Sequence, residues 1–325
     1  MKETKYMSKE YTKCMRGILA ILVVFHHLYQ YSGLVSNRYI GLILQTTGSL
    51  CVAMFFFYSG YGLLLSSRSE KYIDTFLRKR FIPLYSFYVV LIILYTLWTL
   101  LLEKHVSLLA VLQSFFIGGT VVTNGWYLQA TFFAYLMFYF CFKFFKKPIA
   151  QISSFGIVLF IYIILCICFG LDITWYQTIP CMVFGMIYCL QKNNIDVFFK
   201  KFSWLILGSS FILFSICFLL SKYSGVDVIF DILYSILFVC VGITLSYILC
   251  DTPLILNKFF DWAGKYSLEI YVSHGFFLRL IRLGYIENKL LYIVVVIVGT
   301  VLTSIIMGKL RTFIIMCFQK INKSI

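Results

Sequence analysis

Charged residues and prolines are scarce in this chain. Of its 325 residues, 13% are charged and only four are proline, whereas 61% are hydrophobic and the mean hydropathy is +0.91. Soluble globular proteins carry about 25% charged residues, so the composition excludes a soluble globular domain. Apolar runs recur from one end of the chain to the other, which is typical of a polytopic membrane protein.

Cysteine spacings that bind metal ions or form redox pairs are absent from the sequence. The chain has 11 cysteines, but none of them forms a CxxC pair or a Cys/His spacing typical of zinc. Most lie inside apolar runs, where cysteine behaves as a small hydrophobic side chain. We therefore predict no metal site and assign the cysteines no function.

Linkers, low-complexity runs and internal repeats are missing as well. The sequence therefore predicts one transmembrane domain over residues 1–325, and the lack of repeats counts against a transporter built from inverted halves. The basic N-terminal stretch precedes an apolar run without a small-residue cleavage site. We expect this run to be a retained signal anchor.

The apolar runs predict an all-α fold with about ten transmembrane helices. The predicted spans are residues 16–33, 48–66, 82–102, 126–145, 150–169, 173–190, 203–221, 228–250, 264–283 and 290–316. Segment 107–119 is short for a span, so we predict a re-entrant or interfacial element there, on the outer side.

Lysines and arginines separate the apolar runs and form no patch with interleaved aromatics. The net charge of +15 therefore indicates topology and not nucleic-acid binding. With a cytoplasmic N-terminus, 22 of the 28 basic residues fall on the inner side. The six outer ones are Arg38, Lys104, Lys222, Arg279, Arg282 and Lys289. This asymmetry predicts that both termini are cytoplasmic.

The longest inner loop joins the second and third predicted spans. Its charges alternate, and Tyr72, Ile73, Phe76 and Leu77 form an apolar face, so we predict an amphipathic helix in the plane of the lipid headgroups. The basic triplet 78–80 follows, directly before Pro83. This triplet fits a topology signal and an anion-binding site equally well.

The first apolar run contains ionisable groups that hydrocarbon normally excludes. Arg16 and His27 are eleven positions apart, so on a helix they lie about 20° from one face line and roughly 16 Å apart along the axis. A basic group at the inner surface and an imidazole near mid-depth therefore share one face. Snorkelling is the simpler interpretation of Arg16 alone. His26 lies about 80° away, and we expect it to hydrogen-bond a neighbouring helix.

Two later runs also carry polar or small residues. In FFFYSGYG, Ser59, Gly60 and Gly62 favour close approach of another backbone or of a ligand. In SLEIYVSHG, Tyr271 and His274 share a face, and Glu269 adds an acid.

His274 has the same expected depth as the histidine of the first run. Both imidazoles lie roughly 15 Å from the inner surface. A hydrogen bond to a neighbouring helix is the simpler interpretation of either histidine alone. Their equal depth favours a shared site.

The order of these motifs resembles that of the acyltransferase 3 family of membrane acyltransferases. Arg-Gly opens the first span, and a histidine follows eleven residues after the arginine. FFFYSG, an arginine-rich stretch before a proline, Trp-Tyr-Leu and Ser-Leu-x-Ile-Tyr-x-x-His come next in that order. The match extends over residues 13–280.

The resemblance implies a ten-span enzyme of the bacterial inner membrane. Such enzymes move an acyl group, usually acetyl, from cytoplasmic acyl-CoA to a hydroxyl of an extracytoplasmic or lipid-linked glycan. Acetyl-CoA or another acyl-CoA is then a donor substrate, with no permanently bound cofactor, and the partners are membrane lipid and a glycan or glycolipid acceptor. Direct transfer and a covalent intermediate both remain open.

The family motifs can be carried over residue by residue. Arg16 and His27 occupy the Arg/His pair of the first span, Arg80 matches an arginine of the third-span motif, and His274 matches the late histidine. The family often has two arginines three positions apart before the third span. This chain departs from that pattern, because Leu77 and Pro83 stand at that interval and the second arginine, Arg78, is two residues away.

We therefore predict a site with three kinds of residue. The catalytic imidazoles are His27 and His274, the acyl-CoA ligands are Arg16, Arg80 and Arg78, and the supporting residues are Ser59, Tyr271, Glu269 and Trp126. The alternative is a proton-coupled transporter or glycolipid flippase that uses the same histidines as a proton or anion path. A scaffold without activity would leave these histidines unexplained.

Overall fold

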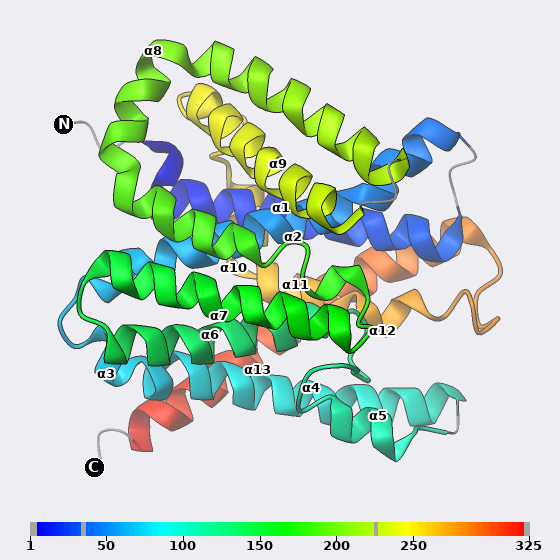
Figure 1. Ribbon diagram of the computed structural model, residues 1–325. Helices are drawn as coiled ribbons and strands as arrows, with labels where there is room; N and C mark the ends of the chain where they lie inside the picture. The colour runs from blue at the N-terminus through cyan, green and yellow to red at the C-terminus, as the bar shows by residue number, and fades with distance from the viewer. Residues whose placement is uncertain (1–4, 34–36, 104, 224–226, 322–325) are drawn as a thin grey trace. The chain divides into compact units, whose positions relative to one another are not determined.

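The computed structural model is all-helical (Figure 1). It describes residues 5–33, 37–103, 105–223 and 227–321, and no β-strand occurs within these ranges. Lys104, one of the six outer basic residues, lies outside them.

The chain forms two compact units, each assembled from three segments. The first unit comprises Met1–Leu19, Thr47–Ser69 and Phe145–Lys265, and the second comprises Ala20–Thr46, Glu70–Phe144 and Tyr266–Ile325. Helices α1 (Lys9–Ser32) and α2 (Arg38–Ser67) each contribute to both units. The single transmembrane domain remains a prediction.

Six helices within the described ranges are long and apolar enough to cross a membrane. They are Arg38–Ser67, Tyr72–Glu103, Pro148–Cys168, Ile173–Tyr223, Val228–Leu249 and Lys289–Lys320. Together with the composition, they make the chain a multi-pass membrane protein. The predicted count of ten spans is not confirmed.

The first unit contains the short helices η1 (Lys5–Met7), η3 (Ile173–Trp175) and α10 (Lys258–Lys265), with α7 (Pro148–Cys168), α8 (Pro180–Tyr223) and α9 (Asp227–Leu249). Helices α8 and α9 lie side by side (Figure 1). The spans predicted at 173–190 and 203–221 lie on either side of a kink at Phe202 (φ −130°, ψ 19°), where two helices of α8 meet. The first of these helices continues through the residues between the two predicted spans. The intervening residues contain no glycine or proline, and the pair Lys192–Asp196 (2.6 Å, one turn apart) stabilises the helix there.

Gly60 allows α2 and α8 to touch at the backbone within the first unit. A Cβ atom on Gly60 would overlap the carbonyl oxygen of Met182, and one on Gly185 would overlap that of Phe57. The predicted close approach of a second backbone to FFFYSG is therefore confirmed for Gly60. A Cβ atom on Gly62 would meet nothing within 4 Å, so Gly62 does not share this role.

The second unit contains the segment that we predicted to lie in the headgroup plane, now divided into a short helix and a π-helical turn, and three long helices. Its elements are α3 (Tyr72–Phe76), a π-helical turn η2 (Leu77–Phe81), α4 (Ile82–Glu103), α5 (Leu108–Gln113), α6 (Trp126–Phe144), α11 (Ser267–Ser273), α12 (Gly275–Leu278) and α13 (Lys289–Ile321). Phe76, which we expected on a lipid-facing surface, is buried against Phe138 of α6 with ring centroids 5.2 Å apart. The amphipathic helix is thus short, and its central aromatic packs on protein.

Segment 107–119 contains the six-residue helix α5, which is about 9 Å long and cannot cross a bilayer. A side chain of α6 holds the loop that follows α5 in place. The buried Gln129 side chain donates to the carbonyl oxygens of Gln113, Ser114 and Gly119 at 3.1, 3.0 and 2.8 Å. These bonds hold the chain that leads into Asn124.

The predicted span 264–283 is wrong as one continuous helix, because α10, α11 and α12 divide it. Side chains from α4 and α13 take carbonyl groups that an unbroken helix would use for itself. Tyr95 donates to the Val272 oxygen (2.5 Å), Trp98 to the Phe276 oxygen (2.7 Å) and Tyr292 to the Leu278 oxygen (3.0 Å). The breaks place His274 between α11 and α12.

Candidate functional site

The second unit brings the two predicted imidazoles into direct contact. The rings of His27 on α1 and His274 stack with centroids 5.1 Å apart and planes 18° apart. Both residues are buried, with exposed fractions of 9% and 0%. The equal depth inferred from the sequence therefore corresponds to a shared location.

Hydrogen bonds define which nitrogen of each ring carries a proton. His27 Nδ1 lies 2.9 Å from Gln30 Oε1, and an amide oxygen only accepts, so Nδ1 donates. His274 Nδ1 lies 3.2 Å from the Ile270 carbonyl oxygen and also donates. In both rings the lone pair is therefore on Nε2.

His274 Nε2 is the chemically conspicuous atom of the site. It is buried and has no hydrogen-bond partner among the described residues. A proton on this nitrogen would be a buried donor without an acceptor, which is costly, and two stacked imidazolium ions would repel each other. The resting pair is therefore neutral, with a free lone pair that can accept a proton.

His26 has the structural role that its position on α1 predicted. Its Nδ1 donates to the Leu44 carbonyl oxygen of α2 at 2.6 Å. The ring also meets His27 edge to face, with centroids 4.6 Å apart. His26 thus holds two helices together and supports the neighbouring ring.

Tyr271 connects the late histidine to the loop before α6. Its ring contacts that of His274 at 5.9 Å, and its hydroxyl donates to the Asn124 carbonyl oxygen at 2.7 Å. Tyr127 contacts Tyr271 at 5.3 Å, whereas the predicted Trp126 contacts Tyr127 at 6.2 Å. Tyr127 is therefore the member of Trp-Tyr-Leu that touches Tyr271, and no feature of the motif distinguished it from Trp126.

Asn124 was also missed by the sequence analysis. It has a φ of 58°, a left-handed conformation that costs most side chains free energy but that asparagine tolerates. Its side-chain Nδ2 is buried without a hydrogen-bond partner among the described residues. The Asn-Gly dipeptide at this position is a turn signal that could have drawn attention to it.

Glu269 has a partner other than the imidazoles. It is completely buried on α11 and pairs with Arg311 of α13, with Arg311 Nε 2.6 Å from Glu269 Oε1. The ion pair joins two helices around the site. Because each charge neutralises the other, breaking this pair would leave an uncompensated buried charge.

The basic triplet lies on the π-helical turn η2. Arg80 Nη1 donates to the Tyr72 hydroxyl at 3.3 Å, and its guanidinium lies 5.6 Å from the Tyr135 ring centroid. Arg78 is exposed. The extra residue per turn changes which side chains share a face, and π-turns are frequent at functional sites.

Arg16 and Ser59 belong to the first unit. Arg16 Nε donates to the Thr12 carbonyl oxygen at 3.3 Å, and Ser59 on α2 is half-buried. The start of α1 packs closely on α10, because a Cβ atom on Gly17 would overlap the backbone of Phe260 and Gly264. The Arg-Gly motif therefore combines a basic group with a helix contact.

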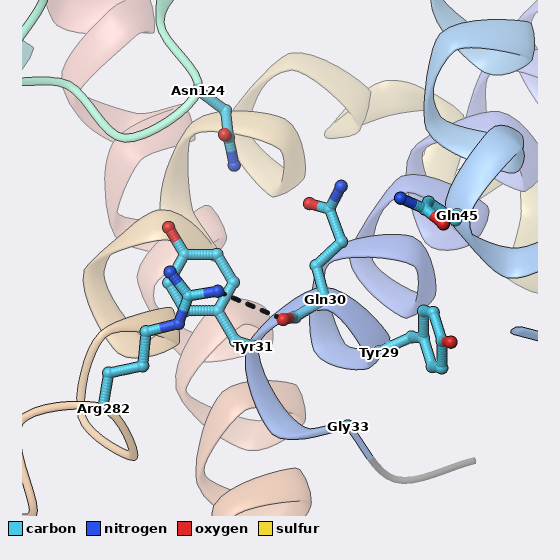
Figure 2. A pocket seen from close by; sticks show the side chains of 7 residues that line it. All are labelled: Tyr29, Gln30, Tyr31, Gly33, Gln45, Asn124 and Arg282. Carbon is cyan, nitrogen blue, oxygen red and sulfur yellow. Dashed lines mark hydrogen bonds between the residues drawn. The ribbon is translucent and has the colours of Figure 1, made fainter. Parts of the chain in front are cut away.

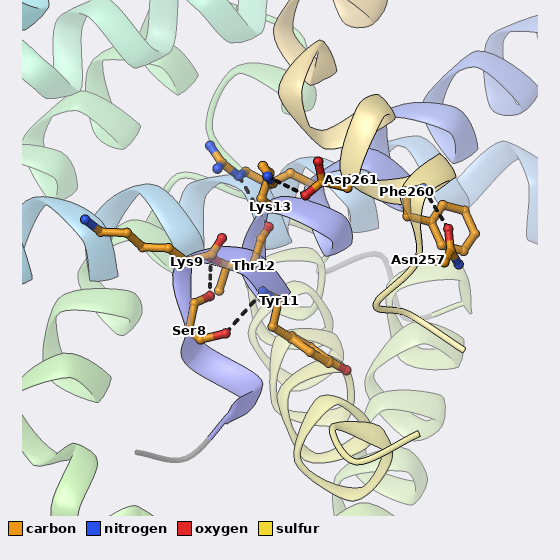
Figure 3. Close-up of polar contacts among 9 residues, drawn as sticks. Ser8, Lys9, Tyr11, Thr12, Lys13, Asn257, Phe260 and Asp261 are labelled. Atoms are coloured by element: carbon orange, nitrogen blue, oxygen red, sulfur yellow. Dashed lines mark hydrogen bonds and ion pairs between the residues drawn. The ribbon is translucent and has the colours of Figure 1, made fainter. Parts of the chain in front are cut away.

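Polar bonds fix the same two segments. Lys13 forms an ion pair with Asp261 of α10, Asn257 Oδ1 accepts from the Phe260 amide at 2.9 Å, and the Ser8 side chain accepts from the Tyr11 amide at 3.2 Å (Figure 3). These contacts set the position of the turn that carries Arg16.

No group of three or more metal-ligating side chains is gathered in the ranges that the structure describes. What those ranges hold is a neutral imidazole pair inside an all-helical membrane protein. Buried ionisable side chains in a multi-pass membrane protein mark a candidate functional site.

The comparison with protein families identifies the particular family. Residues 10–309 match the family model Acyl_transf_3, described as an acyltransferase domain. The match covers most of the chain, so the protein belongs to this acyltransferase family and is an acyltransferase. No curated protein and no solved structure matched the chain.

Proposed function

We propose that the protein is an O-acyltransferase that moves an acyl group, acetyl in our proposal, from cytoplasmic acyl-CoA to a hydroxyl of a cell-surface or lipid-linked glycan. The observation that supports this function best is the buried His27–His274 stack with its unpartnered Nε2. An imidazole in this state is suited to remove a proton from a hydroxyl.

The proposed step is direct attack. The acceptor hydroxyl gives its proton to Nε2 of His274 while its oxygen bonds to the thioester carbonyl carbon. The carbon–sulfur bond then breaks, and the CoA sulfur leaves with the proton that the imidazole returns. The ester and free CoA are formed, and the histidine regains its neutral state. The stacked ring of His27 is neutral, so it adds no second positive charge beside the transient imidazolium, and its bond to Gln30 holds its orientation.

Arginines hold the donor in this proposal. CoA carries phosphates, and guanidinium groups bind phosphate through charge-assisted hydrogen bonds. Arg16, Arg80 and Arg78 fall on the inner side of the topology that the basic residues predict. We therefore place the protein in a bacterial inner membrane with both termini cytoplasmic, and Ser59, Tyr271, Glu269 and Trp126 remain proposed supporting residues.

Replacing the late histidine tests the chemical role. His274→Ala is expected to lower glycan acylation by about 10²–10⁴-fold, the usual contribution of a general base. The measurement is ester content of surface glycans by mass spectrometry in cells that carry only the variant. His105→Ala is the matched control, because His105 is exposed. Unchanged acylation in His274→Ala cells, at equal protein level in the membrane, would contradict the proposal.

Donor binding separates an acyltransferase from a transporter. A ligand that binds the folded state raises the melting temperature, so CoA is expected to stabilise the purified protein, and Arg80→Ala is expected to weaken that effect. The measurement is a thermal shift against CoA concentration. A protein that CoA leaves unchanged at millimolar concentration would favour the transport hypothesis.

A further inference from the structure

A cavity of about 480 Å³ lies in the second unit, near the end of α1. Figure 2 shows its lining, which consists of Tyr29, Gln30, Tyr31, Gly33, Gln45, Asn124 and Arg282. Amides, phenols and one guanidinium provide the side-chain polar groups. Such a wall can hydrogen-bond a polar ligand and stack on its flat faces.

Gln30 connects this cavity to the imidazole pair. Its side-chain oxygen accepts from Nδ1 of His27 at 2.9 Å, while the residue itself lines the cavity (Figure 2). A ligand in the cavity therefore lies one side chain away from His27, which stacks on the proposed base His274.

Asn124 presents a donor that the folded chain leaves unused. In Figure 2 its amide points toward the space between Tyr31 and Gln30, and Nδ2 is buried without a partner among the described residues. Its backbone is held at φ 58° and fixed by the bond from Tyr271. Strain of this kind, maintained by surrounding contacts, is frequent at ligand sites.

Arg282 gives the cavity a positive charge that no lining acid neutralises. Its guanidinium lies 4.1 Å from the Tyr31 ring centroid, and Nη2 donates to the Gln30 carbonyl oxygen at 3.2 Å. Arg279, one turn earlier, pairs with Glu103 at 2.6 Å. No such ion pair involves Arg282 within the described ranges, so its remaining N–H groups are available to an anion.

From this geometry we infer that the cavity binds the acyl acceptor and that this acceptor is an anionic polyol, with a carboxylate or phosphate held by Arg282. Asn124 then donates to a neutral oxygen of the acceptor, and the hydroxyl to be acylated is directed toward the imidazoles. The inference rests on the proposed function, and it adds that the enzyme selects its acceptor by negative charge. The predicted topology places Arg282 on the outer side, where a surface glycan would approach.

Acceptor kinetics with matched sugars test the inference. The purified full-length protein is given acetyl-CoA with methyl glucuronide, glucose 1-phosphate or methyl glucoside. The wild type is expected to prefer one of the two anionic sugars, and whichever is preferred distinguishes a carboxylate from a phosphate. Arg282→Gln is expected to raise KM for that sugar at least tenfold and to leave KM for methyl glucoside unchanged. Lys289→Gln, which removes an exposed positive charge outside the cavity, is expected to leave all three values unchanged.

A binding measurement tests the anion site even if no acyl transfer is found. Glucuronate or inorganic phosphate is expected to raise the melting temperature of the wild type, and Arg282→Gln is expected to abolish this shift. Asn124→Asp, which keeps a side chain that tolerates positive φ but adds a negative charge, is expected to abolish it too. Stabilisation without transfer would refute the proposed function and keep the anion site. Transfer with equal KM values for charged and neutral sugars, unaffected by Arg282→Gln, would refute the anion site alone.

Discussion

At the scale of single residues, Gln30 and the carbonyl of Ile270 decide what the two histidines can do. Gln30 Oε1 accepts a hydrogen bond from Nδ1 of His27 at 2.9 Å, and the Ile270 carbonyl oxygen accepts one from Nδ1 of His274 at 3.2 Å. An imidazole without such a partner interconverts between tautomers, and only one of them presents a lone pair to a hydroxyl. Gln30 is therefore a positioning residue for His27.

Replacing Gln30 separates the orientation of the His27 ring from the binding of acyl-CoA. Gln30→Met keeps the length of the side chain but removes the acceptor, and we expect kcat to fall about tenfold, as for one lost hydrogen bond of about 1.5 kcal/mol. KM for acyl-CoA is expected to stay constant. The measurement is steady-state kinetics of the purified enzyme.

The conservative variant provides the control. Gln30→Glu restores an acceptor oxygen, so kcat is expected to recover toward the wild-type value. If Gln30→Met and Gln30→Glu lower kcat equally, the hydrogen bond is not what orients His27.

At the scale of helices, two helices pack closely where a glycine of one lies against the backbone of the other. Gly60 and Gly185 remove the side chains that would otherwise separate α2 from α8. Gly62, two residues further along α2, meets no atom within 4 Å. The two glycines of one motif therefore have opposite physical settings.

This difference predicts opposite effects of the same substitution. Gly60→Ala is expected to destabilise the fold by about 1–3 kcal/mol, because overpacking forces the helices apart. Gly62→Ala is expected to be neutral or to stabilise by up to about 1 kcal/mol, because alanine favours a helix more than glycine does. Melting temperatures of the purified variants measure both effects. Equal losses for the two variants would show that Gly60 does not mark a backbone contact.

The short helices α10, α11 and α12 illustrate a different determinant. Residues 264–283 were predicted as a single span, but Tyr95, Trp98 and Tyr292 donate to carbonyl oxygens of α11 and α12. The donors come from helices distant in the sequence. A helix propensity computed from the segment alone therefore cannot locate these breaks.

At the scale of the whole molecule, the distribution of basic residues predicts an orientation in the membrane. With 22 of 28 on one side, the positive-inside rule predicts cytoplasmic termini. The same rule places Arg279, Arg282 and Lys289 on the outer side. Donor and acceptor would then reach the enzyme from opposite faces of the membrane.

Reporter fusions test that orientation. Alkaline phosphatase, which is active only outside the cytoplasm, is expected to be inactive at either terminus and active when inserted beside Lys289. Green fluorescent protein fused to the C-terminus is expected to fluoresce. Phosphatase activity at the C-terminus would invert the assignment of donor and acceptor sides.

The amino-acid sequence alone indicated the class and the family, and it predicted an equal depth for the two imidazoles. Apolar runs specify membrane helices because hydrocarbon excludes polar groups, and a constant rise of 1.5 Å per residue converts positions such as 27 and 274 into depths. The motif order carried the family resemblance, which the match over residues 10–309 confirmed.

Only the tertiary structure decided what those imidazoles contact. The stacking of His27 on His274, the ion pair of Glu269 with Arg311, and the cavity wall with Asn124 and Arg282 join residues far apart in the chain. Helical periodicity is a local property, and it gives the face of each helix but not the helix that packs against it. The partner of each functional side chain is therefore fixed by packing between helices.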